Sequence, residues 1–236
     1  MKFAYLIEPP FNHIDASGRV TGCDVELARH VCAALDLGKF EPVETTFAEL
    51  LPGLAAGRWK MTTGLFATDE RRRRAQFSRP IWAAPDGFLV LAGNPRNITG
   101  YRSVASQSDI RLAVIRDQVQ HRSAIEFGVR TDQIAIFEIY ENAAMAVRTG
   151  AVDVYASVAR AHGGFMELHP DWNLEVIPAP ATEKPPAFGS FAIGLEDADF
   201  LIAVDAVLAD YLGTDAHRTM AASFGFSAAE VDLIAA

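Results

Sequence analysis

Residues 59–82 contain the groups best suited to bind a small charged molecule. The run WKMTTGLFATDERRRRAQFSRPIW reads as an apolar strand, a short turn and a helix that begins at Thr68. A hydroxyl at the N-cap, acids in the first turn and a cation just inside are typical of a helix start. This pattern places Thr63, Gly64 and Arg71 near one another. Because a guanidinium offers a planar fork of donors, we interpret Arg71 as a binding group for a ligand carboxylate. The next three arginines are interpreted as a solvated basic face.

The elements that must position these residues alternate along the chain. Strands are predicted at 2–7, 40–44, 59–65, 88–91, 110–115, 134–137, 152–157 and 190–194. Helices are predicted at 24–35, from a capping box at 46–49 through 56, from 68, from an Asp117 cap through 127, at 141–149, and from near 199, 214 and 227. This alternation of strands and helices favours an α/β fold with mainly parallel sheets flanked by helices.

The breaks in this pattern predict two units. One comprises residues 1–90 and 190–236, the other residues 91–189, with a Pro- and Ala-rich connector at 178–186. Two strands would then cross between the units and form a hinge beside a cleft. Clefts of this kind, beyond the carboxyl ends of strands, are favoured binding sites.

Composition narrows the class of protein. At 236 residues and 50% hydrophobic content, the chain can build one large or two small cores. A net charge of −9 argues against nucleic acid or an anionic membrane as the main partner. The N-terminal run MKFAYLIEPPFN has neither a long apolar stretch nor a small-residue cleavage site. We therefore expect a cytoplasmic protein, or a periplasmic one whose leader was removed.

The cysteines and histidines predict no metal site. Cys23 and Cys32 fall on or beside one predicted helix. Their separation along that helix, about 13 Å, is too long for a disulfide, so we expect buried free thiols. No Cys/His spacing is typical of zinc. His121, His162 and His217 are expected to be ordinary surface or helix residues. We expect no metal and no organic cofactor.

Several short segments together resemble a known family. They are Pro9-Pro10-Phe11, GRVTGCDVELA at 18–28, LPGLAAGR at 51–58, TDER at 68–71 with FSRP at 77–80, GAVD at 150–153 and LGT at 212–214. In this order they resemble the bacterial solute-binding proteins of ABC importers, in the polar-amino-acid group with the two-lobed type II periplasmic-binding fold. The resemblance covers nearly the whole chain.

The resemblance implies roles for particular residues. Arg71 would bind the ligand carboxylate, with contacts from Thr63 and Gly64. The second unit would add backbone N–H groups from the helix start at Gln118 and Val119, where an anion is favoured. In this chain, Asp117 and Gln118 replace the small residues that the family usually has there.

The cationic end of the ligand follows a different pattern. Family members usually hold an α-ammonium with an acid a few positions after the Gly-x-x-Asp strand, but this chain has Ala156-Ser157-Val158. We count Ser157 among the ligand contacts and expect Glu8, where the family tends to have an aromatic residue, to supply the acid. Phe11, Phe47 and Phe66 would line the same pocket and suit a bulky or alkylated cation. This combination resembles the ectoine-binding branch.

Simpler interpretations remain for some of these residues. The phenylalanines, Phe47 above all, fit a core, and Glu8 fits an exposed loop. Trp59 is expected in the core, Trp82 and Tyr140 against the hinge or the ligand, and Asp153 at a turn.

We therefore predict a non-enzymatic, monomeric binding protein for a small zwitterion, an amino acid or a compatible solute. Hinge closure around the ligand would present the closed form to an ABC permease. One alternative is an intracellular sensor domain without a transporter. The other is a cyclohexadienyl-dehydratase-like enzyme on the same scaffold, with Glu8 as a general acid.

Overall fold

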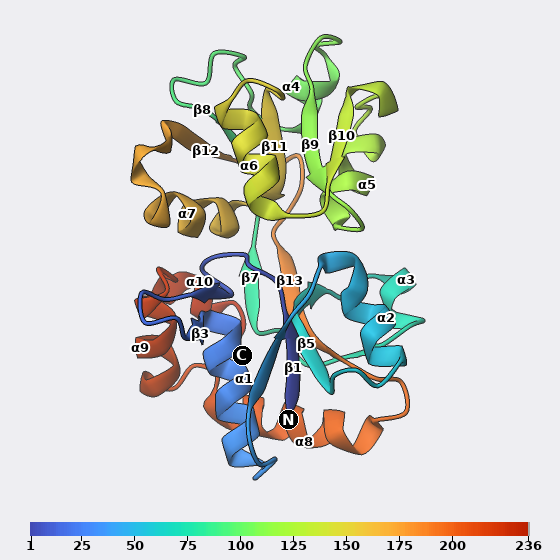
Figure 1. The fold of residues 1–236 in the computed structure, drawn as a ribbon, viewed down its shortest axis with the longest axis vertical. Coiled ribbons are helices and arrows are strands. Elements are labelled where there is room, and N and C mark those ends of the chain that lie inside the picture. Colours follow the sequence, from blue (N-terminus) through green and yellow to red (C-terminus); the bar gives the residue numbers. More distant parts are fainter. Residues whose placement is uncertain (236) are drawn as a thin grey trace. The chain divides into compact units, whose positions relative to one another are not determined.

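The chain folds into two compact units, and the computed structural model describes residues 1–235. Unit 1 comprises Met1–Ala83 and Phe188–Ala236, and unit 2 comprises Ala84–Ala187. The chain leaves unit 1 within β7 (Trp82–Ala84) and returns at the start of β13 (Ala187–Ile193). Both connecting segments can be followed in Figure 1. The sequence places these boundaries after residues 90 and 189.

The sheet of unit 1 has the strand order β4-β1-β5-β13-β6, and β7 pairs with β13. Its strands are β1 (Lys2–Tyr5), β4 (Glu41–Glu44), β5 (Met61–Phe66), β6 (Gln76–Phe77) and β13. β4, β1 and β5 run parallel, while β13 is antiparallel to both β5 and β6. A small hairpin, β2 (His13–Ile14) with β3 (Val20–Thr21), lies outside this sheet.

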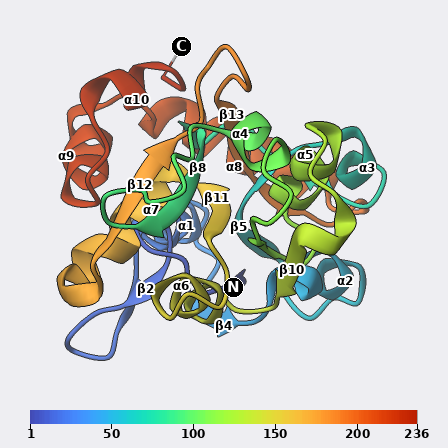
Figure 2. The ribbon, with the colours of Figure 1, turned by 90° about the horizontal axis from the view of Figure 1, so that it is seen from above.

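Helices cover the sheet of unit 1 on both faces. α1 (Cys23–Ala34) buries Val25, Leu27, Ala28, Val31 and Cys32, which recur at helical spacing. α2 (Leu50–Ala55) packs with Leu65 and Trp59 in a separate core cluster. The remaining helices are α3 (Asp69–Arg72), α8 (Ala198–Tyr211), α9 (Asp215–Ser223) and α10 (Ala228–Asp232). α9 and α10 lie side by side in both views (Figures 1 and 2).

Unit 2 is contiguous and carries a sheet of order β10-β9-β11-β8-β12. Its strands are β8 (Asp86–Leu91), β9 (Leu112–Ile115), β10 (Ile134–Phe137), β11 (Val154–Val158) and β12 (Leu174–Pro178). β10, β9 and β11 run parallel, and β8 is antiparallel to β11 and β12. β13 in unit 1 and β8 in unit 2 each run antiparallel to their neighbours in the sheet. Each of these strands also lies next to a segment where the chain passes from one unit to the other.

Side-chain alternation along the strands separates two layers of helices in unit 2. The helices are α4 (Tyr101–Ala105), α5 (Val119–Glu126), α6 (Tyr140–Arg148) and α7 (Ala159–Leu168). Phe88 and Val90 share a core cluster with residues of α4 and α5. Tyr155 points the other way and contacts Tyr140 of α6 and His162 of α7.

Several sequence-based predictions need correction. The Thr46 side chain makes no capping bond: a 3₁₀ turn at Phe47–Glu49 precedes α2, and Glu49 pairs with Arg58. His162 and His217 lie in helices α7 and α9, as one of the two expected placements has it, but both are buried and neither is a surface residue. The element α7 was not predicted, because its N-cap is Val158 and it contains two glycines, which gives no capping signal. β12 and α4 were not predicted either.

Other predictions are confirmed. Thr214 and Ser227 cap α9 and α10, and Ser227 forms a reciprocal capping box with Glu230. Cys23 and Cys32 are free and buried. Among residues 1–235, no helix has both the length and the apolar character needed to cross a bilayer.

Candidate functional site

Arg71 is held at the start of α3, directly after β5. The Thr68 side chain caps this helix and accepts from the Arg71 backbone N–H at 3.3 Å, as the sequence predicts. The Arg71 side chain returns to the end of β5, where Nη1 donates to the Phe66 carbonyl oxygen at 3.0 Å. Its guanidinium carbon lies 5.1 Å from the centre of the Phe47 ring. Arg71 is only 8% exposed, so its side chain is buried.

Thr63 and Gly64 lie on β5, but their donors point to a residue that the sequence did not single out. The Thr63 hydroxyl donates to Asp24 Oδ2 at 2.6 Å, and the Gly64 N–H donates to the same oxygen at 2.8 Å. Asp24 Oδ1 accepts from Trp82 Nε1 at 3.0 Å. A hydroxyl has one proton to donate, and in this arrangement the Thr63 proton is used by Asp24.

Burial of the Asp24 carboxyl dominates its acid–base behaviour. Its pKa is raised to about 6 by burial, against the opposing hydrogen bonds from Thr63, Gly64 and Trp82. Asp24 is 1% exposed and lies in the first turn of α1. The signal in the sequence was weak: an acid near a helix start is ordinary, and only the tertiary fold shows that this one is buried.

The aromatic residues near the site form a connected group, which we call the ring cluster: Phe11, Phe66 and Trp82. The Trp82 ring centroid lies 4.7 Å from that of Phe11 and 5.5 Å from that of Phe66. A Cβ on Gly64 would lie 2.7 Å from Trp82 Nε1, so this glycine makes room for the indole. Phe47 lies against Arg71.

Glu8 and Phe11 belong to one tight loop. The Glu8 N–H donates to the Asn12 carbonyl oxygen at 2.9 Å, and the Asn12 N–H donates back to that of Glu8 at 3.1 Å. Glu8 is 9% exposed, which corrects its interpretation as an exposed loop acid. Asn12 anchors this loop, because its Nδ2 donates to Thr63 Oγ1 at 2.8 Å.

In unit 2, the structure brings together Gln118 and Ser157. The Ser157 hydroxyl donates to Gln118 Oε1 at 3.3 Å, and both side chains are buried. The N-cap of α5 is Gln118, not Asp117 as predicted, because Asp117 adopts a left-handed conformation with φ 63°. Val119 is the first helical residue and is half-buried.

Sequence reasoning missed a buried polar network next to α5. Asp86 accepts from Gln120 Nε2 at 2.8 Å through one oxygen. Its other oxygen accepts from the Tyr101 hydroxyl at 2.6 Å and from Lys184 Nζ at 2.5 Å. Lys184 also donates to Ser123 at 2.8 Å. Lys184 lies in the segment predicted to be a plain connector, so the sequence carried no signal of this ion pair.

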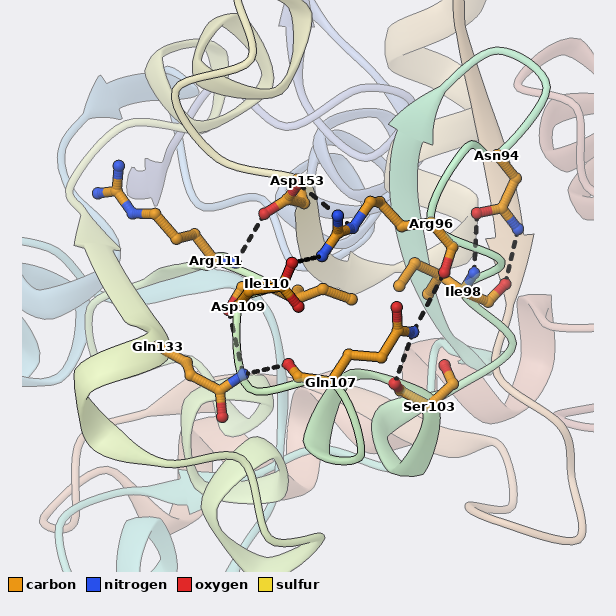
Figure 3. Close-up of polar contacts among 10 residues, drawn as sticks. All are labelled: Asn94, Arg96, Ile98, Ser103, Gln107, Asp109, Ile110, Arg111, Gln133 and Asp153. Atoms are coloured by element: carbon orange, nitrogen blue, oxygen red, sulfur yellow. Dashed lines mark hydrogen bonds and ion pairs between the residues drawn. The ribbon is translucent and has the colours of Figure 1, made fainter.

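Two further polar residues of unit 2 have structural roles. Asp153 accepts from the Arg111 N–H at 2.8 Å and lies 3.7 Å from Arg96 Nε, as Figure 3 shows. His162 is fully buried, and burial lowers its pKa to about 3. Its Nδ1 pairs with the Tyr140 hydroxyl at 2.5 Å. Tyr140 therefore packs inside unit 2, while Trp59 lies in the unit 1 core as predicted.

Within residues 1–235, no group of three or more His, Cys, Asp or Glu side chains is arranged to hold a metal ion.

Comparisons with known proteins agree on one family. Residues 2–218 match the model of the bacterial extracellular solute-binding proteins, family 3. The chain is 30% identical over 228 residues to a probable amino-acid ABC transporter periplasmic-binding protein of Sinorhizobium fredii, covering 93% of this chain and 74% of that protein. It is 26% identical to the arginine-binding protein ArgT of Corynebacterium glutamicum, covering 95% and 73%.

Among solved structures, EhuB in complex with hydroxyectoine is similar over 100% of this chain and 93% of its own, with a TM-score of 0.89 and 25% identity. The fold is thus the two-lobed type II periplasmic-binding fold, with a sheet and flanking helices in each unit. The chain belongs to the bacterial extracellular solute-binding proteins of family 3.

Proposed function

We propose that this protein binds a small zwitterionic solute of the ectoine or amino-acid type and delivers it to an ABC permease outside the cytoplasm. Family membership supports the binding role. The observation that carries the ligand class is the position of Arg71, a buried guanidinium held at the carboxyl end of β5.

Arg71 receives the carboxylate of the ligand. Its bond to the Phe66 carbonyl oxygen holds the guanidinium at the end of β5. The planar fork of guanidinium donors matches a carboxylate. The low exposure of Arg71 reduces screening by water, which strengthens a charge-assisted hydrogen bond. Phe47 supports the guanidinium from one side.

Glu8 and the ring cluster receive the cationic end. The rings of Phe11, Phe66 and Trp82 provide faces that attract a delocalised or alkylated cation, and Glu8 supplies the countercharge. The stretch where the family usually carries the acid for an α-ammonium is Ala156-Ser157-Val158 in this chain and contains no acid. A compact cyclic zwitterion fits this distribution better than a long basic amino acid, and the likeness to EhuB with hydroxyectoine supports it.

In this proposal, unit 2 supplies further contacts to the ligand. Backbone N–H groups at the start of α5, beside Gln118 and Val119, would bind the same carboxylate. Ser157, which already bonds to Gln118, would orient that helix start. A ligand that contacts both units then favours the closed state, which the permease recognises.

The test is a thermal-shift panel of ectoine, hydroxyectoine, betaines, opine-like compounds and amino acids. A ligand at 100 times its Kd stabilises the native state by about 2.7 kcal/mol. The variant Arg71→Ala should lose this shift. Arg73→Ala, which removes an exposed arginine just beyond the same helix, is the matched control and should keep it. A shift that survives Arg71→Ala refutes the proposed carboxylate site.

Binding without turnover is part of the proposal. NMR spectra of the recovered ligand should be unchanged after prolonged incubation with the protein. Conversion of an added cyclohexadienyl substrate would favour the enzymatic alternative instead.

A further inference from the structure

Asp24 connects elements that the proposed function places around the ligand. Its carboxylate accepts from Thr63 at 2.6 Å, from the Gly64 N–H at 2.8 Å and from Trp82 Nε1 at 3.0 Å. Thr63 in turn accepts from Asn12 Nδ2 at 2.8 Å. We call these five residues the Asp24 network.

Two members of the network contact different parts of the candidate site. Trp82 is the central ring of the ring cluster and contacts both Phe11 and Phe66. Asn12 closes the loop that carries Glu8 and Phe11 through paired backbone hydrogen bonds. Asp24 itself is 1% exposed.

The direction of the hydrogen bonds depends on the charge of Asp24. An ionised carboxylate only accepts, so every donor of the network can point at it. A protonated carboxyl must also donate, and its new O–H then competes with one of the existing donors. Within residues 1–235, buried Asn12 Oδ1 has no hydrogen-bond partner. A turned Asn12 amide could use this oxygen to accept from Thr63, which gives the network a second arrangement.

We propose that the Asp24 carboxylate is a positioning residue for ligand binding, which orients the Trp82 ring directly and the Glu8–Phe11 loop through Thr63 and Asn12. This inference rests on the proposed function. Asp24 does not touch the ligand. Neutralising its carboxylate weakens binding because the Trp82 ring and the Glu8–Phe11 loop lose the orientation that binds the ligand.

This dependence produces a pH profile. Burial places the pKa of Asp24 near 6, so about a tenth of the protein carries the carboxylate at pH 5. If the carboxylate form binds, apparent affinity for the ligand falls about tenfold between pH 7.5 and pH 5.

Four other ionisable groups lie near this end of α1. They are Cys23 of α1, Tyr211 of α8, His217 of α9 and Glu230 of α10. Burial raises the pKa of Cys23 and lowers that of His217, so both favour their neutral forms. The Asp24→Asn variant separates any contribution of these groups, since it removes only the carboxyl titration.

The experiment has one arm without ligand. The indole Nε1–H resonance of Trp82, assigned by its loss in Trp82→Phe, is followed from pH 7.5 to pH 4.5. We expect a titration with a midpoint near 6 in the native chain and none in Asp24→Asn. A resonance that does not move in the native chain overturns the proposal, and this outcome holds even if Asp24→Asn fails to fold.

The second arm measures the affinity for hydroxyectoine by calorimetry. Asp24→Asn should bind about tenfold more weakly at pH 7.5 and show a flat profile, while Glu26→Gln on the same helix should match the native chain. Affinity within twofold of native for Asp24→Asn, or a native profile that persists in that variant, refutes the positioning role. Absence of hydroxyectoine binding by the native chain counts against the proposed ligand, while the indole arm still decides the role of Asp24.

Discussion

The buried ion pair between Lys184 and Asp86 should be essential for the stability of unit 2. Lys184 Nζ lies 2.5 Å from Asp86 Oδ2, and their side chains are 17% and 1% exposed. Replacing Lys184 by Met leaves Asp86 buried with its charge uncompensated. Removal of one partner of a buried pair costs about 3–5 kcal/mol.

The remaining partners of Asp86 place the expected loss at the low end of that range. Tyr101 and Gln120 still donate to its carboxylate at 2.6 and 2.8 Å. We therefore expect Lys184→Met to lower the free energy of unfolding of unit 2 by about 3 kcal/mol. Adding Asp86→Asn should recover part of this loss, because the buried charge is then gone.

The assay is urea denaturation with hydrogen exchange read peptide by peptide, which resolves the two units. The control is Lys60→Met, which breaks the Lys60–Asp197 pair in unit 1. Those side chains are 43% and 35% exposed, so the expected cost is under about 1 kcal/mol. If Lys184→Met costs no more than Lys60→Met, the pair contributes little and the reasoning from burial is wrong.

The other predictions concern the pH dependence of stability, the charge of the ligand and the space around Gly64. The pKa of Asp24 is raised from 3.8 to about 6 in the folded protein, so the folded protein binds this proton more tightly than the unfolded chain does. Up to about 3 kcal/mol of unit 1 stability is therefore lost as pH rises from 3.8 through 6. The pKa of His162 is lowered from 6.5 to about 3, so up to about 5 kcal/mol of unit 2 stability is lost as pH falls from 6.5 through 3. Peptide-resolved exchange at pH 7 and pH 5 should show these opposite contributions, and Asp24→Asn and His162→Phe should each remove one. Glu8→Gln should weaken zwitterionic ligands but spare simple carboxylates in calorimetry, and equal loss for both would make Glu8 a structural residue. Gly64→Ala should cost about 1–3 kcal/mol in thermal unfolding, because its Cβ would lie 2.7 Å from Trp82 Nε1, and a neutral result would mean that the indole moves easily.

The parts of the structure that the sequence predicts are those encoded locally. The caps at Thr68 and Ser227 need a hydroxyl and a backbone N–H three residues later, so a short window of sequence contains the whole signal. The predicted strand at 134–137 matches β10 for the same reason, as a short apolar run between turns. Arg71 was singled out because it lies just inside such a cap.

The parts that the sequence does not predict depend on distant contacts. Asp24 meets Thr63 and Trp82 across 39 and 58 positions, so its burial cannot be read from its neighbours in the chain. Lys184 lies 98 positions from Asp86, in a stretch whose composition is typical of a loop. Such contacts follow from the packing of complete units, which local patterns do not specify.

The strand order has a consequence for biosynthesis. β13 lies between β5 and β6 in the sheet of unit 1, yet it is made only after all of unit 2. A nascent chain that has reached residue 187 therefore contains every strand of unit 2 but has a vacant place in the middle of the other sheet. Unit 2 can complete its core during translation, whereas the lobe that begins with the N-terminus must wait for the last fifth of the polypeptide.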